Sequence, residues 1–310
     1  MELTELPTRF ISALRALDIP ASEGEPVQWG TFQSGVQAWN AALKLKGDAR
    51  FVDADTNLNR VPVPPVPFTV IGWPVRMVVW GLNPHYSDAV LAEKRQAVAA
   101  PGTWGSYARF HLPRPHDAGS PWPGVLPWAI KSQYYYNLGT IAATLQSRQF
   151  HTLQHFYERT HQRSERRLRA FWDRTQQFGV MAAEFLPFHS KRAAFPINVR
   201  NFLGHGHPQL ALADQMDAYH EVLLQTIVDT LGPDGWIIAL GNAAANAAET
   251  LLKCHGTLKI NYHQNKIQVG VWTPQNSPNC YKVSLSPFMG TAGGPLNRNA
   301  DIERWLQKVW

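Results

Sequence analysis

Cysteine is scarce in this chain: its 310 residues include only Cys254 and Cys280. Two thiols cannot hold an iron–sulfur cluster, which needs four protein ligands. So few cysteines are also more typical of a reducing compartment than of a domain stabilised by several disulfides. We therefore expect two buried free thiols and a cytoplasmic location, with a single structural disulfide as the alternative.

Long hydrophobic runs are missing as well. No stretch of about 18 apolar residues occurs, so no transmembrane helix is expected. The first residues, Met1–Leu6, include two glutamates and lack the basic and apolar regions of a signal peptide. The chain also has no G-x-S-x-G, P-loop or G-x-G-x-x-G motif, which disfavours hydrolase, nucleotide-triphosphatase and dinucleotide-binding functions of those types.

Basic residues outnumber acidic ones, giving a formal net charge of +6 and a pI of about 9.4. Such a balance attracts polyanions, of which nucleic acid is the commonest, although ordinary basic soluble proteins share it. Between His151 and Arg192, eight Lys or Arg stand against four Asp or Glu. We therefore expect DNA as the partner of a monomeric protein without membrane attachment.

Four short apolar segments predict buried strands of a parallel sheet: residues 76–81, 178–186, 236–241 and 281–286. Stretches with helical patterns lie between and after them, at 132–148, 153–177, 209–231, 242–254 and 299–309. This alternation predicts an α/β fold, a three-layer α/β/α sandwich with a central four-stranded parallel sheet. In such sheets, functional residues lie in loops just beyond the carboxyl ends of the strands.

Two regions stand outside this alternation. Residues 1–70 are expected to form a helical extension and a Pro-rich connector, with the extended Pro-rich stretch over 61–75, and residues 71–310 the main domain. Residues 100–130 predict a long irregular insertion, which in compact domains is usually a lid or binding loop. Its tryptophans could equally fix the loop to the protein body: Trp104, Trp122 and Trp128.

The first predicted strand ends in Gly81-Leu82-Asn83-Pro84-His85-Tyr86. Gly81 permits a sharp turn and Pro84 fixes the loop, so that Asn83 would be held rigidly at the end of the sheet. A held carboxamide can orient water through its oxygen and bind a substrate through its nitrogen. The same hexapeptide also suits a simple turn in which Asn83 caps a helix.

The last predicted strand runs into a polar loop, Ser284-Leu285-Ser286-Pro287-Phe288-Met289-Gly290, followed by more glycines and Arg298. Backbone amides and hydroxyls in such a loop can bind phosphate groups. An exposed apolar side chain, Phe288 or Met289, can fill the gap left by a flipped base. The alternative is an ordinary loop whose apolar side chains are buried.

Four segments together resemble motifs of the uracil-DNA glycosylase superfamily, in the same order along the chain. Gly81-Leu82-Asn83-Pro84 resembles the first motif in the Asn form of the mismatch-specific uracil/thymine glycosylases. Ser284-Leu285-Ser286-Pro287 resembles the second motif, whose best-known form is His-Pro-Ser-Pro-Leu. Trp236–Ala244 resembles the third strand with its Leu-Gly-x-x-Ala helix start, and Phe185–Ser190 resembles the stretch after the second strand.

The resemblance implies a monofunctional enzyme that flips a pyrimidine out of DNA and hydrolyses its N-glycosidic bond, without a metal or cofactor. His151 and His155 have the spacing of a metal pair on a helix, but no carboxylate completes a known pattern. Ser284 stands where the second motif usually has a histidine, so the imidazole that stabilises the leaving base is missing. Mismatch-type members also lack this histidine, and activity is still expected.

The resemblance also implies roles for particular residues. Asn83 would be catalytic and hold the attacking water, while Asn137 reads the base and Tyr136 or a neighbouring tyrosine stacks on it. The substrate pocket would be lined by Leu82, His85, Tyr86, Trp104, Tyr136, Asn137 and His189. DNA would be contacted by Ser284, Ser286, Pro287, Phe288, Met289, Gly290, Arg298, Lys191 and Arg192.

His85 bears on which pyrimidine is expected. A tyrosine there in strict uracil enzymes blocks substituents at C5, and a glycine in mismatch enzymes leaves the space open. With the insertion's tryptophans as platforms, the pocket would suit a 5-substituted cytosine such as the glucosylated hydroxymethylcytosine of phage DNA. The superfamily is similar in outline to a bacterial phage-defence glycosylase that removes such bases, which implies antiviral defence. Repair of uracil or mismatched bases, and a catalytically silent DNA-binding relative, are the alternatives.

Overall fold

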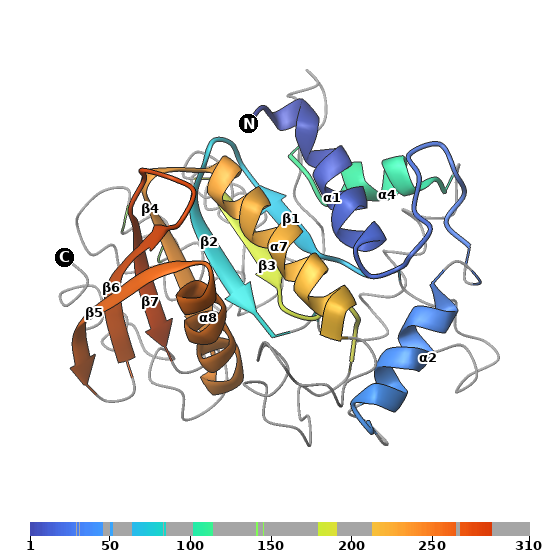
Figure 1. Ribbon diagram of the computed structural model, residues 1–310. Helices are drawn as coiled ribbons and strands as arrows, with labels where there is room; N and C mark the ends of the chain where they lie inside the picture. The colour runs from blue at the N-terminus through green and yellow to red at the C-terminus, as the bar shows by residue number, and fades with distance from the viewer. Residues whose placement is uncertain are drawn as a thin grey trace, which may run out of the picture.

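The computed structural model describes residues 1–28, 30, 32–45, 50–51, 64–82, 84, 102–113, 141, 145, 179–190, 213–264 and 267–286. Within them the protein is mixed α/β, built on one seven-stranded sheet in the order β1-β3-β2-β4-β7-β6-β5 (Figure 1). Among these residues, no helix combines the length and apolar character needed to cross a membrane.

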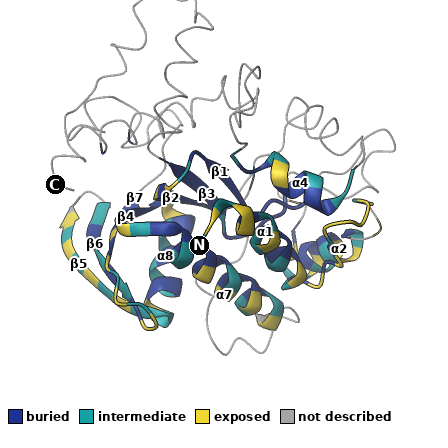
Figure 2. Cartoon of the chain, turned by 90° about the horizontal axis from the view of Figure 1, so that it is seen from above, coloured by how far each residue is buried: buried dark blue, intermediate teal, exposed yellow. Residues whose placement is uncertain are grey.

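The middle of the sheet is parallel. Its four neighbouring strands are β3 (Val180–Glu184), β2 (Val75–Gly81), β4 (Leu231–Leu240) and β7 (Tyr281–Ser286). These are the four strands predicted from the sequence, and their pairing confirms an α/β fold with a parallel core. They are drawn largely in the colour of buried residues (Figure 2), as expected for parallel strands, which are covered on both faces.

Antiparallel strands make the sheet larger than predicted. β1 (Phe68–Ile71) pairs with β3, and the hairpin of β5 (Gly256–Gln264) and β6 (Ile267–Pro274) pairs with β7 through β6. The prediction of an extended connector over 61–75 is therefore wrong in part, because β1 and the start of β2 lie within this range. The predicted boundary at residue 70 falls inside β1, and the division into two regions stays a prediction.

Helices α7 (Ala213–Thr230) and α8 (Asn242–Cys254) lie over one face of the parallel strands (Figure 1) and agree with the predictions at 209–231 and 242–254. α8 is rich in alanine, the strongest helix former. Gly241, with a φ of 98°, turns the chain from β4 into α8. α7 buries one stripe at helical spacing: Met216, Tyr219, His220, Leu223, Leu224 and Ile227.

The N-terminal residues are helical, as predicted, with a short 3-10 helix η1 (Leu3–Glu5) followed by α1 (Leu6–Arg15) and α2 (Gln33–Ala42). α1 packs on α7 and on α4 (Trp104–Phe110). α4 corrects the expectation that the segment from 100 onwards is irregular. It forms because Thr103 caps it: the Thr103 hydroxyl accepts a hydrogen bond from Ser106 N at 3.1 Å.

Both cysteines are free thiols, as expected. Their predicted burial is wrong, since Cys254 is half-buried at the end of α8 and Cys280 is exposed just before β7. Burial raises the pKa of the Cys254 thiol, with a smaller contribution from Asp217.

Candidate functional site

The carboxyl ends of β2 and β4 form the most favourable place for a site in this sheet. From β2 the chain continues to β3 on one side, and from β3 it crosses back past β2 to reach β4 on the other. The connections that leave β2 and β4 therefore diverge, and open α/β sheets bind ligands at such a topological switch point. Gly81 ends β2 there, and Asn83 follows two residues later in the sequence.

The loop after β2 is held by the segment that follows β3. Leu186 N donates a hydrogen bond to the Leu82 carbonyl oxygen at 2.9 Å, and Ser190 N donates to the Pro84 carbonyl oxygen at 3.3 Å. Leu82 and Pro84 are the chain neighbours of Asn83, which itself lies outside the described residues. Both neighbours are thus hydrogen-bonded to one segment, the one that follows β3.

Helix α7 in turn supports the start of that segment. The Tyr219 hydroxyl donates to the Glu184 carbonyl oxygen at 2.7 Å, and His220 Nε2 lies 3.0 Å from the Phe185 carbonyl oxygen. Burial and then the nearby Glu184 carboxylate raise the pKa of Tyr219 well above its usual value, so the hydroxyl keeps its proton. Trp80 stacks on Phe185 with 4.4 Å between ring centroids. The backbone at the carboxyl end of β3 is therefore fixed.

His220 makes this support depend on pH. Burial lowers the pKa of His220 from 6.5 to about 4; the hydrogen bond to Phe185 opposes this shift, and His255 adds to it. Because the folded state disfavours the charged form, the stabilisation is complete above pH 6.5 and is lost as pH falls towards 4. We expect this group to lower the free energy of unfolding by about 2 kcal/mol between pH 7 and pH 5.

Urea unfolding at several pH values measures this effect. The variant His220→Gln keeps an N–H donor for the Phe185 carbonyl but has no group that titrates, so the expected part of the pH slope should disappear. Comparing slopes rather than absolute stabilities removes any constant cost of the substitution. The same slope in both proteins would contradict the assignment.

The N-terminal helical region supports the other end of the segment after β3. Phe51 N donates to Asn40 Oδ1 at 2.7 Å, and Asn40 Nδ2 donates to the Phe51 carbonyl oxygen at 3.2 Å. Phe51 then forms an isolated β-bridge with Ser190 and a ring contact with Phe188, with centroids 5.4 Å apart. The N-terminal residues therefore help to position the segment that holds the loop after β2.

The strand register aligns one row of residues along the carboxyl edge. Gly81 pairs with Glu184, Leu240 pairs with Ser286, and the preceding residues of β2 and β4 pair with each other. Residues in one row face the same side of the sheet, and successive rows alternate. Trp80 belongs to the core cluster shared with α7 and α8, so the row of Gly81 faces the opposite side.

Glu184 is a candidate functional residue that the sequence analysis missed. It is half-buried at the end of β3. A Cβ added to Gly81 would lie 2.6 Å from Glu184 Oε2, so the carboxylate occupies the space above the β2 backbone. A single acidic residue at the end of an apolar run was the only sequence signal, and it matched no motif.

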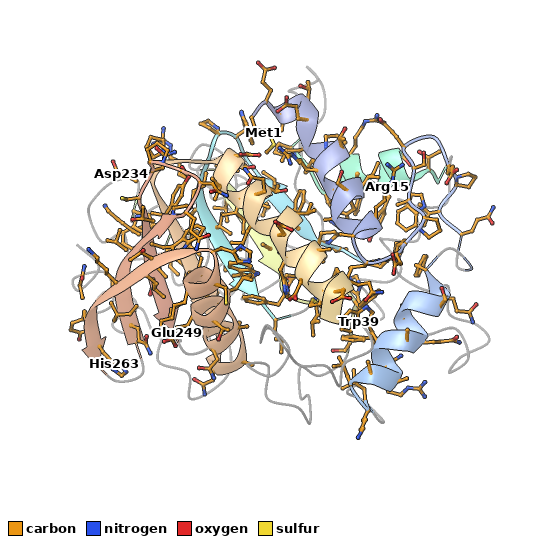
Figure 3. All side chains as sticks on the ribbon, in the orientation of Figure 1. Met1, Arg15, Trp39, Asp234, Glu249 and His263 are labelled. Carbon is orange, nitrogen blue, oxygen red and sulfur yellow. The ribbon has the colours of Figure 1, made fainter. Side chains whose placement is uncertain are left out.

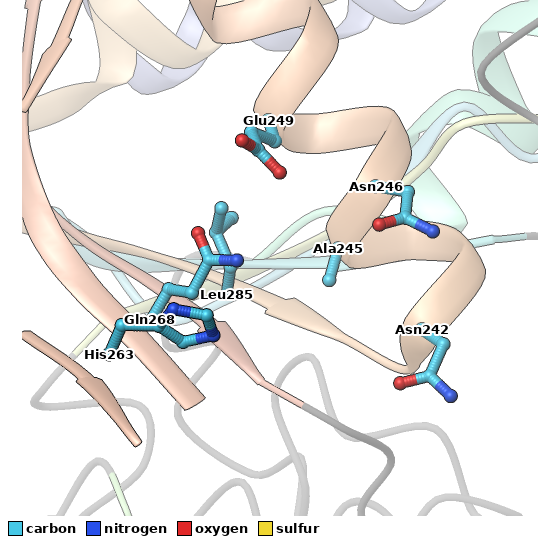
Figure 4. A pocket seen from close by; sticks show the side chains of 7 residues that line it. All are labelled: Asn242, Ala245, Asn246, Glu249, His263, Gln268 and Leu285. Atoms are coloured by element: carbon cyan, nitrogen blue, oxygen red, sulfur yellow. The ribbon is translucent and has the colours of Figure 1, made fainter. Parts of the chain in front are cut away.

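A polar cavity of about 360 Å³ lies near the same edge, between α8 and the β5–β6 hairpin. Figure 4 shows Asn242 and Asn246 on one side and His263 and Gln268 on the other. Glu249 also lines the cavity; Figure 3 labels it on α8 and His263 on β5. The apolar lining residues are Ala245 and Leu285, and none of the lining residues is Lys or Arg. Side chains that both donate and accept suit a neutral ligand with hydroxyl or amide groups better than a phosphate.

Most of the predicted site residues lie outside the described residues and stay predictions. Of Asn83, Asn137 and Ser286, which were expected to share one cleft, only the backbone of Ser286 is described, and it lies in the row at the carboxyl edge. The residues outside the described part are Asn83, His85, Tyr86, Tyr136, Asn137, Lys191, Arg192, Pro287, Phe288, Met289, Gly290 and Arg298.

Two predicted contacts are wrong in this structure. Trp104 is 0% exposed and packs edge-to-face on Phe32, so its ring offers no free face to a base or sugar. Ser284 is also 0% exposed, because it lies inside β7 rather than in the loop that follows, and its side chain has no surface for a phosphate. Leu82 and His189 do lie at the carboxyl edge, but both are buried.

No group of three metal-ligating side chains of the His, Cys, Asp or Glu type occurs among the residues that the structure describes. The comparisons with protein-family models, with curated proteins and with solved structures gave no match to this chain.

Proposed function

We propose that this chain is a monofunctional DNA glycosylase that flips a pyrimidine out of DNA and hydrolyses its N-glycosidic bond. The observation that carries the proposal is the pair of backbone hydrogen bonds that hold Leu82 and Pro84 at the carboxyl end of β2. The sequence there, Gly81-Leu82-Asn83-Pro84, resembles the catalytic motif of the uracil-DNA glycosylase superfamily, and the loop leaves a parallel sheet at its switch point. Of the other segments that resemble the superfamily, Phe185–Ser190 follows β3, Trp236–Ala244 spans the end of β4 and the start of α8, and Ser284–Ser286 form the end of β7.

The proposed chemistry suits a restrained carboxamide. Cleavage develops positive charge on the sugar and negative charge on the leaving base, so positioning and electrostatics supply most of the rate. Asn83 would hold the attacking water, and the ties on Leu82 and Pro84 would fix its position before the substrate binds. The loop after β7 and the basic residues Lys191 and Arg192 would contact the DNA backbone, in keeping with the net charge of +6.

The preferred substrate in this proposal is a 5-substituted cytosine, with glucosylated hydroxymethylcytosine of phage DNA as the best candidate and antiviral defence as the role. Trp104 is buried and cannot serve as a platform for the sugar. We place the sugar instead in the polar cavity beside α8, whose side chains can bind hydroxyls. This cavity lies on the α8 face of the sheet, so the sugar would reach it past the carboxyl ends of β4 and β7.

An abasic-site assay tests the proposal. Single- and double-stranded DNAs would carry uracil, a G·T mismatch, hydroxymethylcytosine or its glucosylated form, and alkali would reveal each abasic site. We expect the glucosylated base to be released fastest. Faster release of uracil or of the mismatched thymine would assign the protein to repair. DNA binding without release of any base would leave only a DNA-binding function.

Gln268 in the cavity gives a prediction about this selectivity. Gln268→Ala should slow release of the glucosylated base by about tenfold and release of plain hydroxymethylcytosine much less, because it removes contacts that only the sugar makes. Single-turnover rates on the two DNAs measure this ratio. The matched control is Gln225→Ala on α7. The Gln225 side-chain amide donates a hydrogen bond to Asp229, and neither residue lines the cavity. An unchanged ratio in Gln268→Ala would exclude the cavity as the sugar site.

A further inference from the structure

Glu184 places a carboxylate over the last residue of β2. Its Oε2 and Oε1 lie 2.6 and 3.4 Å from the position that a Cβ on Gly81 would take. The side chain of the last β3 residue therefore lies over the end of β2, and a side chain at residue 81 would displace this carboxylate. Gly81 ends β2 at the switch point and is two residues before Asn83 in the sequence.

The strand register defines the surroundings of this carboxylate. Glu184, Gly81 and Leu240 belong to the last row of the parallel strands, and this row lies on the face opposite α7 and α8. Glu184 is half-buried, and its charge contributes to the raised pKa of Tyr219. A carboxylate in such partly desolvated surroundings acts on nearby charges more strongly than one in bulk water.

A carboxamide alone supplies no proton acceptor. Asn83 can orient a water molecule but cannot take its proton, because an amide is not basic near neutral pH. The first motif in its Asn form therefore lacks a proton acceptor within its own sequence. Glu184 lies beside that motif and comes from a neighbouring strand.

We infer that Glu184 is a catalytic carboxylate of the proposed glycosylase, an inference that rests on the proposed function. The C1′–N1 bond breaks and its electron pair leaves with the base. The water oxygen forms a bond to C1′, and the water proton passes to Glu184. The anionic base takes up a proton from solvent. Before the transfer, the negative charge of Glu184 stabilises the positive charge that develops on the sugar.

Three variants test this role. Glu184→Gln keeps the shape and removes the basicity, and should lower single-turnover kcat by about tenfold or more with little change in DNA affinity. Gly81→Ala keeps the carboxylate but displaces it, and should also lower kcat. Glu184→Ala opens a space that formate can enter, and added formate should restore part of its activity. Glu221→Gln, an exposed carboxylate on α7, is the matched control and should behave as the wild type.

The outcomes separate this inference from the proposed function. If the wild type releases no base from any DNA, the proposed function fails. If the wild type is active and folded Glu184→Gln turns over at the same rate, Glu184 is not catalytic. If Glu184→Ala loses activity that formate does not restore, while Gly81→Ala stays fully active, the carboxylate is structural and the inference is overturned.

Discussion

Asn83→Ala is expected to lower the rate of base release at least about a hundredfold, equivalent to about 2.7 kcal/mol of activation free energy. The reason is that a water positioned by the Asn83 carboxamide lowers the activation free energy of base release, whereas phosphate contacts elsewhere determine the affinity for DNA. DNA binding should therefore change by less than about threefold, since few backbone contacts are lost. Single-turnover release of the base and fluorescence anisotropy with labelled DNA measure the two quantities.

The control for this variant is another asparagine. Asn261 is exposed on β5, at the edge of the sheet away from β2, and Asn261→Ala should leave both the rate and the affinity unchanged. The hydrogen bonds to Leu82 and Pro84 involve only backbone atoms, so Asn83→Ala should keep them and leave the protein folded. Wild-type turnover by the folded variant would rule out Asn83 as the residue that positions water.

The four parallel strands could be predicted because their sequences are continuous apolar runs bounded by Gly and Pro, and such runs fit strands buried on both faces. β1 was missed because it is short and follows a proline cluster that suggested a connector. The β5–β6 hairpin has polar and apolar residues in alternation, including Lys259 and Asn261, and this pattern does not resemble a buried run. α4 was missed because glycine and proline surround it.

Less of the candidate site than of the fold could be predicted from the sequence. The motif around Asn83 could be recognised in the sequence because its residues are contiguous. The backbone hydrogen bonds on either side of Asn83 join residues about a hundred positions apart, Leu82 with Leu186 and Pro84 with Ser190. No pattern in the nearby sequence predicts either pair. Glu184 likewise becomes a candidate only once the strand register pairs it with Gly81, which the sequence does not predict. Trp104 was misassigned because composition suggested a lid, while the capping of α4 by Thr103 places its ring in the core.

Gly179→Ala is expected to cost at least about 3 kcal/mol of the free energy of unfolding, the largest stability effect that we predict. Gly179 precedes β3 and has a φ of 72°, a left-handed conformation that costs alanine about 1–2 kcal/mol. A Cβ there would also lie 1.8 Å from the Pro74 carbonyl oxygen, a backbone atom that cannot rotate away. Relieving the clash would disturb the start of β2, where Arg76 N donates to the Gly179 carbonyl oxygen at 2.9 Å.

Urea unfolding of Gly179→Ala and of Gly24→Ala separates this effect from the general consequence of removing a glycine. A Cβ on Gly24 would meet nothing within 4 Å, so its substitution should change the free energy of unfolding by less than about 1 kcal/mol in either direction. Gly179 lies at the amino ends of the strands, and a folded fraction of Gly179→Ala should still bind DNA, because the carboxyl edge is at the other end of the sheet. Equal stability of the two variants would show that the backbone at residue 179 tolerates a side chain, and that the close approach of Pro74 does not constrain the start of β3.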